Sequence, residues 1–270
     1  MEPMIEQLRV RPGDPANLAE RDPRGTPGAP GNETETGAVT AVQLERIAQL
    51  QERLYAEGKR SLLVVLQGVD CSGKDGTIRH VIRGLNPAGT RVAAFKAPTP
   101  IELAHDFLWR VHRQTPGAGE VVVFNRSHYE DVTAVRVRRL APEQVWRMRY
   151  EHINAFERLL GHGGTRVLKC LLHISKEEQA RRMRKRAEDP KKRWKLNADD
   201  LANHERYAEY QQAFAEMIER TSTDQIPWWV VPADHKWYRN WAVAEILEHT
   251  LEDMNPKYPD LPPIPEALSL

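Results

Sequence analysis

The chain has 270 residues, with 39 lysines and arginines against 38 aspartates and glutamates, and a formal net charge of +1 at pH 7. That balance excludes a uniformly basic nucleic-acid binder and a strongly acidic tail. No apolar run approaches the roughly 20 residues needed to cross a bilayer. Cys71 and Cys170 lie far apart and match neither a disulfide framework nor a zinc site. We therefore expect a cytoplasmic protein that does not enter the membrane.

Residues 1–39 are rich in Pro-Gly turn signals and have almost no hydrophobic periodicity. They predict an extended N-terminal arm, which from the pattern alone is either disordered or packed on the body. A helix is predicted over 39–57 because Val42, Ile47, Leu50 and Leu54 recur at helical spacing, and Gly58 ends it.

Beyond the arm, short apolar runs alternate with helical patterns. Strands are predicted at 61–66, 91–95, 120–124, 166–174 and 228–231, and helices at 74–85, 102–114, 142–160 and 241–254. Such alternation is typical of βαβ units, in which helices cover both faces of a parallel sheet. The sequence thus predicts an α/β fold with about five parallel strands, and a single domain over residues 40–270.

A phosphate-binding loop follows the first predicted strand. Gly68, Gly73 and Lys74 match the G-x-x-x-x-G-K pattern between a buried strand and a helix, as that motif requires. Glycines let backbone N–H groups close around an anion, the helix start adds positive partial charge, and the lysine reaches phosphoryl oxygens. An ordinary glycine-rich turn is the alternative. The candidate phosphate-binding residues here are Gly68, Ser72, Gly73, Lys74, Asp75, Gly76 and Thr77.

Two carboxylates set this loop apart from a standard P-loop. Asp75 occupies the position where a standard loop has Ser or Thr, and Asp70 lies inside the loop. Carboxylates repel phosphates unless a cation lies between them, so Asp70 is a candidate ligand for Mg²⁺. For Asp75 we favour a simpler role as an acidic residue that complements the dipole at the start of a helix.

The third predicted strand ends at a second polar cluster. Asn125 stands where a Walker-B acid is expected, and the neighbouring Arg126 can bind phosphate through its planar guanidinium. His128 follows, and a lone histidine of this kind is more often structural than catalytic.

A basic segment at 181–195 reads RRMRKRAEDPKKRWK and carries a net charge of +7, which leaves −6 for the rest of the chain. Ser175 and Glu178 have the spacing of a capping box, so a helix is expected to start near Ser175 and to place Arg182 and Arg186 on one face. Asp189-Pro190 ends it, and a second helix is expected from Asn197 or Asp199. A solvated charged surface is the alternative, but the position after the fourth strand favours a lid over the phosphate loop, at about 175–215.

Together these residues resemble the type 2 polyphosphate kinases, P-loop kinases related in fold to thymidylate kinases. The shared motifs are LAERDP at 18–23, LQERLYA at 50–56, the loop at 68–76, FNRSHYEDV at 124–132, Glu178-Gln179 with Arg182 and Arg186, Asp189-Pro190, Trp194-Lys195, Pro227-Trp228, Asp234 and Lys236. The resemblance favours an arm that is ordered and packed.

The resemblance implies reversible, Mg²⁺-dependent phosphoryl transfer between inorganic polyphosphate and adenine nucleotides, in a homo-oligomer (dimer or tetramer). The combination of Asn125 and Glu130 resembles the subgroup that acts on both AMP and ADP. The implied catalytic residues are Asp70, Lys74, Asn125, Arg126 and Glu130. Asp70, Asn125 and Glu130 are the implied metal ligands, and Arg126, Arg182, Arg186 and Lys236 are implied to bind the phosphate chain.

Two other functions fit parts of the sequence. An ordinary ATP-dependent nucleotide or small-molecule kinase would share the loop and lid, but it leaves Asp70 and the long basic segment unexplained. A nucleic-acid binder would use the 181–195 segment, but aromatic residues should then be interleaved with the basic ones, and only Trp194 is. We therefore expect no nucleic-acid partner.

Overall fold

The computed structural model describes residues 4–196 and 198–260. In this part of the chain, a six-stranded sheet has the order β1-β6-β5-β2-β4-β3. The strands are β1 (Arg9–Val10), β2 (Ser61–Gln67), β3 (Thr90–Ala94), β4 (Val121–Asn125), β5 (Thr165–His173) and β6 (Trp228–Pro232). β2 to β6 are mutually parallel, whereas β1 pairs with β6 in the antiparallel direction. The α/β prediction is confirmed, and the five predicted strands are joined by this short sixth one.

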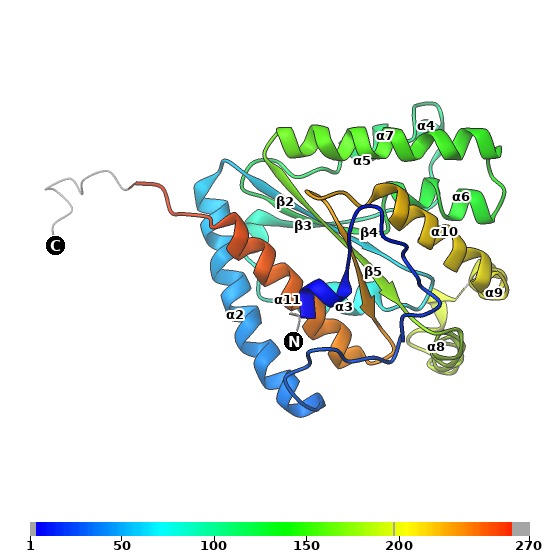
Figure 1. Ribbon diagram of the computed structural model, residues 1–270, viewed down its shortest axis with the longest axis horizontal. Helices are drawn as coiled ribbons and strands as arrows, with labels where there is room; N and C mark the ends of the chain where they lie inside the picture. Colours follow the sequence, from blue (N-terminus) through cyan, green and yellow to red (C-terminus); the bar gives the residue numbers. More distant parts are fainter. Residues whose placement is uncertain (1–3, 197, 261–270) are drawn as a thin grey trace, which may run out of the picture.

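Helices cover both faces of the sheet (Figure 1). One layer holds α2 (Glu33–Glu57), α3 (Lys74–Val81) and α11 (Lys236–Met254), with α11 packed on α2. The opposite layer holds α6 (Ala134–Val137), α7 (Glu143–His162) and α10 (Tyr207–Thr221), with α4 (Pro100–Leu103) and α5 (Trp109–His112) behind them. Because both faces are covered, β2 is buried at every position. Among the described residues, no helix combines the length and apolar character needed to span a bilayer.

Several predicted helix boundaries are wrong, two of them for a visible local reason. α2 starts at Glu33 instead of residue 39, because Asn32 and Glu35 form a capping box. α3 ends at Val81 instead of residue 85. The helix predicted over 102–114 is two short helices, since Asp106 caps a new turn through the N–H of Leu108. α11 begins at Lys236, five residues before the prediction.

The N-terminal segment is packed on the body, as the resemblance favours. α1 (Met4–Leu8) and β1 lie against β6, and Leu8, Val10, Ala16 and Leu18 are all buried in the common core.

The predicted lid is a group of short helices after β5: α8 (Lys176–Glu188), the 3₁₀ turn η3 (Arg193–Lys195) and α9 (Ala198–Glu205). Ser175 caps α8 through the N–H of Glu178, and Asp189 follows its last residue, as predicted. Asn197, one of the two predicted starts of the second lid helix, lies outside the described residues.

Candidate active site

The loop between β2 and α3 has a backbone that only glycine adopts without strain at two positions. Gly68 and Gly73 have φ angles of +145° and +107°. A Cβ on Gly68 would lie 2.8 Å from the carbonyl oxygen of Leu172, and one on Gly73 would lie 1.8 Å from Nη1 of Arg239. The two glycines of the motif are thus required by both conformation and space.

Lys74 is folded back onto this loop. Its Nζ donates to the carbonyl oxygens of Gly68 (2.6 Å) and Val69 (3.1 Å), and the residue is buried. Burial, reinforced by the positive charge of Arg126, lowers the pKa of Lys74 to about 8. The buried hydroxyls of Ser72 and Thr77 have no hydrogen-bond partner among the described residues. A cation and two free hydroxyls in one loop suit a ligand with several oxygen atoms.

Asp70 is held from two sides. Arg126 binds one of its carboxylate oxygens, and Nδ2 of Asn203 in α9 donates to the other at 2.9 Å. Burial would raise the pKa of Asp70, but the charges of Arg126 and Lys74, with the hydrogen bond from Asn203, outweigh it and lower the pKa below its usual value. Asp70 is therefore a charged carboxylate at neutral pH.

Arg126 contacts two carboxylates of the candidate site, those of Asp70 and Glu130. It follows β4 with a φ of +63°, a strained conformation for a residue with a side chain, and also contacts Glu130 at 3.4 Å. The negative charge of Glu130 raises the pKa of Arg126, so its cation is fixed. Asp70 and Glu130 are thereby placed on either side of one guanidinium.

Asp75 has a second role that the sequence pattern did not show. It stands in the first turn of α3, as expected for a dipole-complementing acid. Its carboxylate also accepts a hydrogen bond from Nδ2 of Asn125 (2.8 Å) and forms an ion pair with Nζ of Lys195 (2.7 Å). Asp75 therefore connects the end of β4 to the lid.

Helix α8 is attached to the loop by two side chains. Arg182 donates through Nη1 to the carbonyls of Cys71 (3.1 Å) and Ser72 (3.0 Å), and through Nη2 to those of Ala233 and Asp234. Gln179 donates to the carbonyl of Asp70 at 3.0 Å. Helix α8 of the predicted lid is thus in direct contact with the loop between β2 and α3.

Two other predicted phosphate-binding residues lie near the loop. The charge of Arg186 lowers the pKa of Asp70, and Lys236 stands at the start of α11. Burial lowers the pKa of Lys236, and the charges of Arg182, Lys185 and Arg239 lower it further. This side of the loop is accordingly a cluster of positive charge.

Arg239 belongs to the same cluster and was not predicted. It is 3% exposed, and its Nη1 lies 3.4 Å from the carbonyl oxygen of Ser72. Burial, with the nearby charge of Arg182, lowers the pKa of Arg239 to about 9. An arginine on a distant C-terminal helix gives no sequence signal that connects it to the loop.

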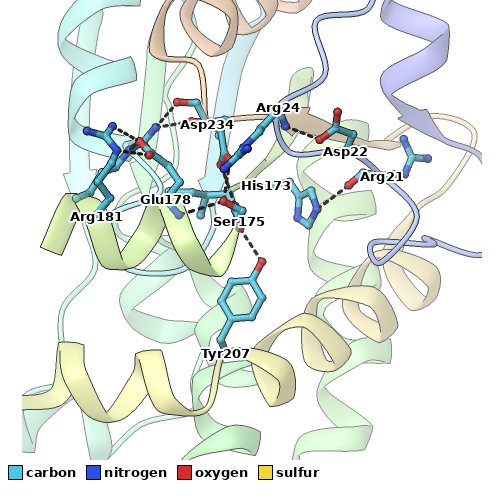
Figure 2. A network of polar contacts seen from close by, with 12 residues as sticks. Arg21, Asp22, Arg24, His173, Ser175, Glu178, Arg181, Tyr207 and Asp234 are labelled. Atoms are coloured by element: carbon cyan, nitrogen blue, oxygen red, sulfur yellow. Dashed lines mark hydrogen bonds and ion pairs between the residues drawn. The ribbon is translucent and has the colours of Figure 1, made fainter.

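The N-terminal arm supports the start of the lid (Figure 2). Asp234 accepts hydrogen bonds from the backbone N–H (2.9 Å) and hydroxyl (2.7 Å) of Ser175, the residue that caps α8. Arg24 in the arm contacts Asp234 at 3.5 Å, and the carbonyl of Arg21 contacts Nε2 of His173 at 3.1 Å. The arm therefore lies beside the carboxyl end of β5.

The side chain of His128 is fully buried in the protein interior. Its Nε2 lies 3.4 Å from Glu157, which also pairs with Lys169 (2.7 Å) and accepts a hydrogen bond from Tyr129 (2.7 Å). This environment favours the structural interpretation of His128.

Comparison with known proteins gives consistent matches. The family model described as Polyphosphate kinase 2 (PPK2) matches residues 32–259. An "AMP/ADP-polyphosphate phosphotransferase" from Meiothermus ruber is 50% identical over 94% of this chain and 96% of its own length. An "ADP-polyphosphate phosphotransferase" from Rhodopseudomonas palustris is 37% identical, over 96% and 93% of the two chains. The crystal structure of Polyphosphate Kinase 2 from Arthrobacter aurescens TC1 superposes with a TM-score of 0.93 at 42% identity and covers 97% of this chain and 93% of that one.

Proposed function

The chain belongs to the polyphosphate kinase 2 family, and from this membership we propose that the site around Lys74 transfers phosphoryl groups reversibly between inorganic polyphosphate and AMP or ADP. One observation carries the proposal. Arg126 binds Asp70 close to Lys74, and the predicted lid contacts the same loop. The name of the Meiothermus ruber relative, with both AMP and ADP in it, supports the two acceptors.

In the proposed reaction, an oxygen of the acceptor's terminal phosphate attacks the terminal phosphorus of the polyphosphate. The P–O bond to the rest of the chain breaks, and the shortened chain leaves with the electron pair. No side chain forms a covalent bond, so the protein contributes position and charge. Lys74 and Arg126 would bind the transferred phosphoryl group, and the basic cluster with Arg182, Arg186 and Lys236 would bind the chain.

Asp70, Asn125 and Glu130 are our proposed ligands for Mg²⁺. Carboxylate oxygens suit this ion, and Asp70 and Glu130 are brought together by Arg126. Bound Mg²⁺ supplies charge neutralisation on phosphate oxygens. Calorimetric titration of Mg²⁺-ADP should show that Asp70→Asn weakens binding at least about tenfold, since one anionic ligand is lost. Equal binding by the variant would remove Asp70 from the ligand set.

The basic segment argues against the nucleic-acid alternative. Three of its nine cations are engaged by other groups of the protein: Arg182 binds backbone carbonyls, Lys195 pairs with Asp75, and the exposed Arg181 pairs with Glu178. A surface that grips a nucleic-acid backbone keeps its cations available for phosphates.

One assay separates the proposal from both alternatives. The purified protein is given Mg²⁺, AMP or ADP, and long-chain polyphosphate as the sole phosphoryl donor, and ADP and ATP are measured. We expect product with each acceptor. An ATP-dependent kinase or a nucleic-acid binder would form none, and that result would refute the proposal.

We place this reaction in the cytoplasm, where both cysteines would stay reduced. Cys71 and Cys170 are free thiols in the structure.

A further inference from the structure

A closed ring of hydrogen bonds joins three side chains in the interior of the protein. Nζ of Lys169 in β5 donates to Oε2 of Glu157 in α7 (2.7 Å) and to the hydroxyl of Tyr129 (3.0 Å). The Tyr129 hydroxyl in turn donates to Oε1 of Glu157 at 2.7 Å. Lys169 also donates to the carbonyl oxygen of Thr221, the last residue of α10, at 2.7 Å. All three N–H groups of the ammonium group are therefore used.

The hydrogen-bond ring holds two charges away from water. None of its three side chains is more than 1% exposed. Burial would raise the pKa of Glu157, but the charge of Lys169 outweighs it and lowers that pKa, so Glu157 is a carboxylate at neutral pH. A buried ion pair is often no more stabilising than two apolar side chains of similar size. Stability alone therefore gives no reason for these charges.

The hydrogen-bond ring ends on a turn that carries part of the candidate active site. Tyr129 belongs to the 3₁₀ turn η2 (His128–Asp131), which follows β4. His128 and Tyr129 are fully buried. The next residue, Glu130, is half-buried and contacts Arg126 at 3.4 Å. Neighbouring residues of one turn thus contact the ring on one side and the site on the other.

The backbone around Tyr129 is closely held. Its carbonyl oxygen accepts hydrogen bonds from the N–H groups of Val132 (3.2 Å) and Thr133 (3.1 Å) and from the hydroxyl of Thr133 (2.8 Å). Its own N–H donates to Oγ of Ser127 at 3.2 Å. Because these bonds couple the residue to both of its neighbours, a displaced Tyr129 side chain would also shift the adjacent Glu130.

We propose that Glu157 and Lys169 are positioning residues for the phosphoryl transfer. They hold the Tyr129 hydroxyl, which fixes η2 and with it the place of Glu130 beside Arg126. The kinetic part of this inference rests on the proposed function. A misplacement of about 1 Å in a reacting site costs on the order of 100-fold in rate. A ring that only filled the core would change stability and leave the rate as it is.

Tyr129→Phe tests the link between the ring and η2, because it removes one oxygen and keeps the aromatic side chain. Hydrogen exchange of the amides at 130–133 reports on η2 with no substrate present. We expect this exchange to be at least about tenfold faster than in the wild type, since a hydrogen bond to charged partners is lost. With polyphosphate and ADP, we expect kcat to fall about tenfold and the KM for polyphosphate to stay within about twofold.

A triple variant separates positioning from stability. Tyr129→Phe alone leaves buried donors and acceptors of Lys169 and Glu157 without a partner, whereas Tyr129→Phe with Glu157→Leu and Lys169→Met removes both charges together. We expect the triple variant to unfold at the same temperature as Tyr129→Phe or a higher one. Its kcat should remain as low, because η2 still has no anchor.

The matched control is Ile47→Ala, which truncates a fully buried residue of α2 in the opposite helix layer. It should lower the unfolding temperature and leave kcat unchanged at a temperature where the variant is folded. The proposal fails if Tyr129→Phe keeps wild-type exchange and kcat, if the triple variant regains wild-type kcat, or if Ile47→Ala loses as much kcat as Tyr129→Phe. A wild type that transfers nothing from polyphosphate would refute the proposed function, and the exchange at 130–133 would still decide whether the ring fixes η2.

Discussion

Lys74 is a cation held in a nearly dry environment, and this sets its response to pH. Its pKa is lowered to about 8, so above that pH the free enzyme loses the positive charge that we propose binds phosphate. We expect the KM for polyphosphate to rise about tenfold per pH unit above 8, since the protonated fraction falls tenfold. The matched variant is Lys74→Arg, whose guanidinium stays charged and should remove the inflection. An inflection retained in the variant would assign the titration to another group.

Phosphate binding is expected to weaken as the pH rises, but the same lowered pKa of Lys74 makes the folded protein more stable as the pH rises. The folded protein holds fewer protons on Lys74 than the unfolded chain between pH 8 and the ordinary value of 10.5. Lys74 therefore contributes an unfolding free energy that increases with pH across this window. Chemical denaturation of wild type and Lys74→Met, each measured at several pH values, should show this increase in the wild type alone. A rise of equal size in both would exclude Lys74 as its source.

Gly73 is constrained by its own backbone and by Arg239. With φ at +107° and Nη1 of Arg239 only 1.8 Å from the position of a Cβ, Gly73→Ala must displace either the loop or the buried guanidinium. We expect a loss of more than about 1 kcal/mol in unfolding free energy and loss of most activity. Gly84→Ala is the control, because a Cβ there meets nothing within 4 Å. Thermal unfolding and kcat measure the two effects, and a Gly73→Ala enzyme as active as Gly84→Ala would contradict this account.

At the scale of elements, helix α8 is tied to the loop by one of two neighbouring arginines. The side chain of Arg182 is 9% exposed and bonds four backbone carbonyls, whereas that of Arg181 is 56% exposed and pairs only with Glu178 among the described residues. Lysine cannot reproduce the planar fork of arginine. We expect Arg182→Lys to lower kcat/KM about 100-fold, and hydrogen exchange over 176–205 to become faster.

Arg181→Lys is the control for the same helix and the same chemistry. It should keep activity within about twofold. Equal losses in the two variants would show that the helix responds to total charge instead of to the contacts of Arg182.

The strands were more predictable from the sequence than the helices. Buried parallel strands leave continuous apolar runs in the sequence. The ends of all five parallel strands were therefore predicted to within about one residue. The start of α2 was missed because Pro30 and Gly31 mask the capping box at Asn32. β1 is two residues long and exists only because β6 offers a free edge, so no periodicity could reveal it.

Candidate site residues that stand directly after a predicted strand could be grouped from the sequence. Asp70, Lys74 and Arg126 stand at the ends of neighbouring strands, and parallel strands bring such ends together. Arg239 and Asn203 reach the loop from helices far along the chain. Their contacts depend on how α9 and α11 pack, which a single sequence does not specify.

Viewed as a whole molecule, the near-zero net charge conceals an uneven distribution. The +7 segment at 181–195 is turned partly inward, with Arg182 on the loop and Lys195 on Asp75. Its cations thus add to those of Arg239 and Lys236 around one loop. A polyanion is attracted to that local field, while the balanced total keeps long-range attraction to other polyanions small.

We expect the N-terminal arm to unfold in the same cooperative unit as the kinase body. Leu8 is 3% exposed and lies in the common core, and α1 packs on both β6 and α11. Leu8→Ala should lower the unfolding free energy by about 2–5 kcal/mol, because it removes buried methyl groups and leaves a cavity. Val42→Ala, a truncation at a 58% exposed site, should change it by less than about 0.5 kcal/mol.

Calorimetry distinguishes a packed arm from an appended tail. If the arm folds with the body, Leu8→Ala shifts one unfolding transition as a whole, since every probe then reports the same cooperative event. If the arm unfolded by itself, the main unfolding transition would keep its midpoint in Leu8→Ala. A midpoint that changes little in both Leu8→Ala and Val42→Ala would show that the arm unfolds separately from the body. The cooperative outcome would also extend to the lid, because Arg24 contacts the Asp234 that holds the capping Ser175 of α8. Hydrogen exchange in α8 should then become faster in Leu8→Ala and remain unchanged in Val42→Ala.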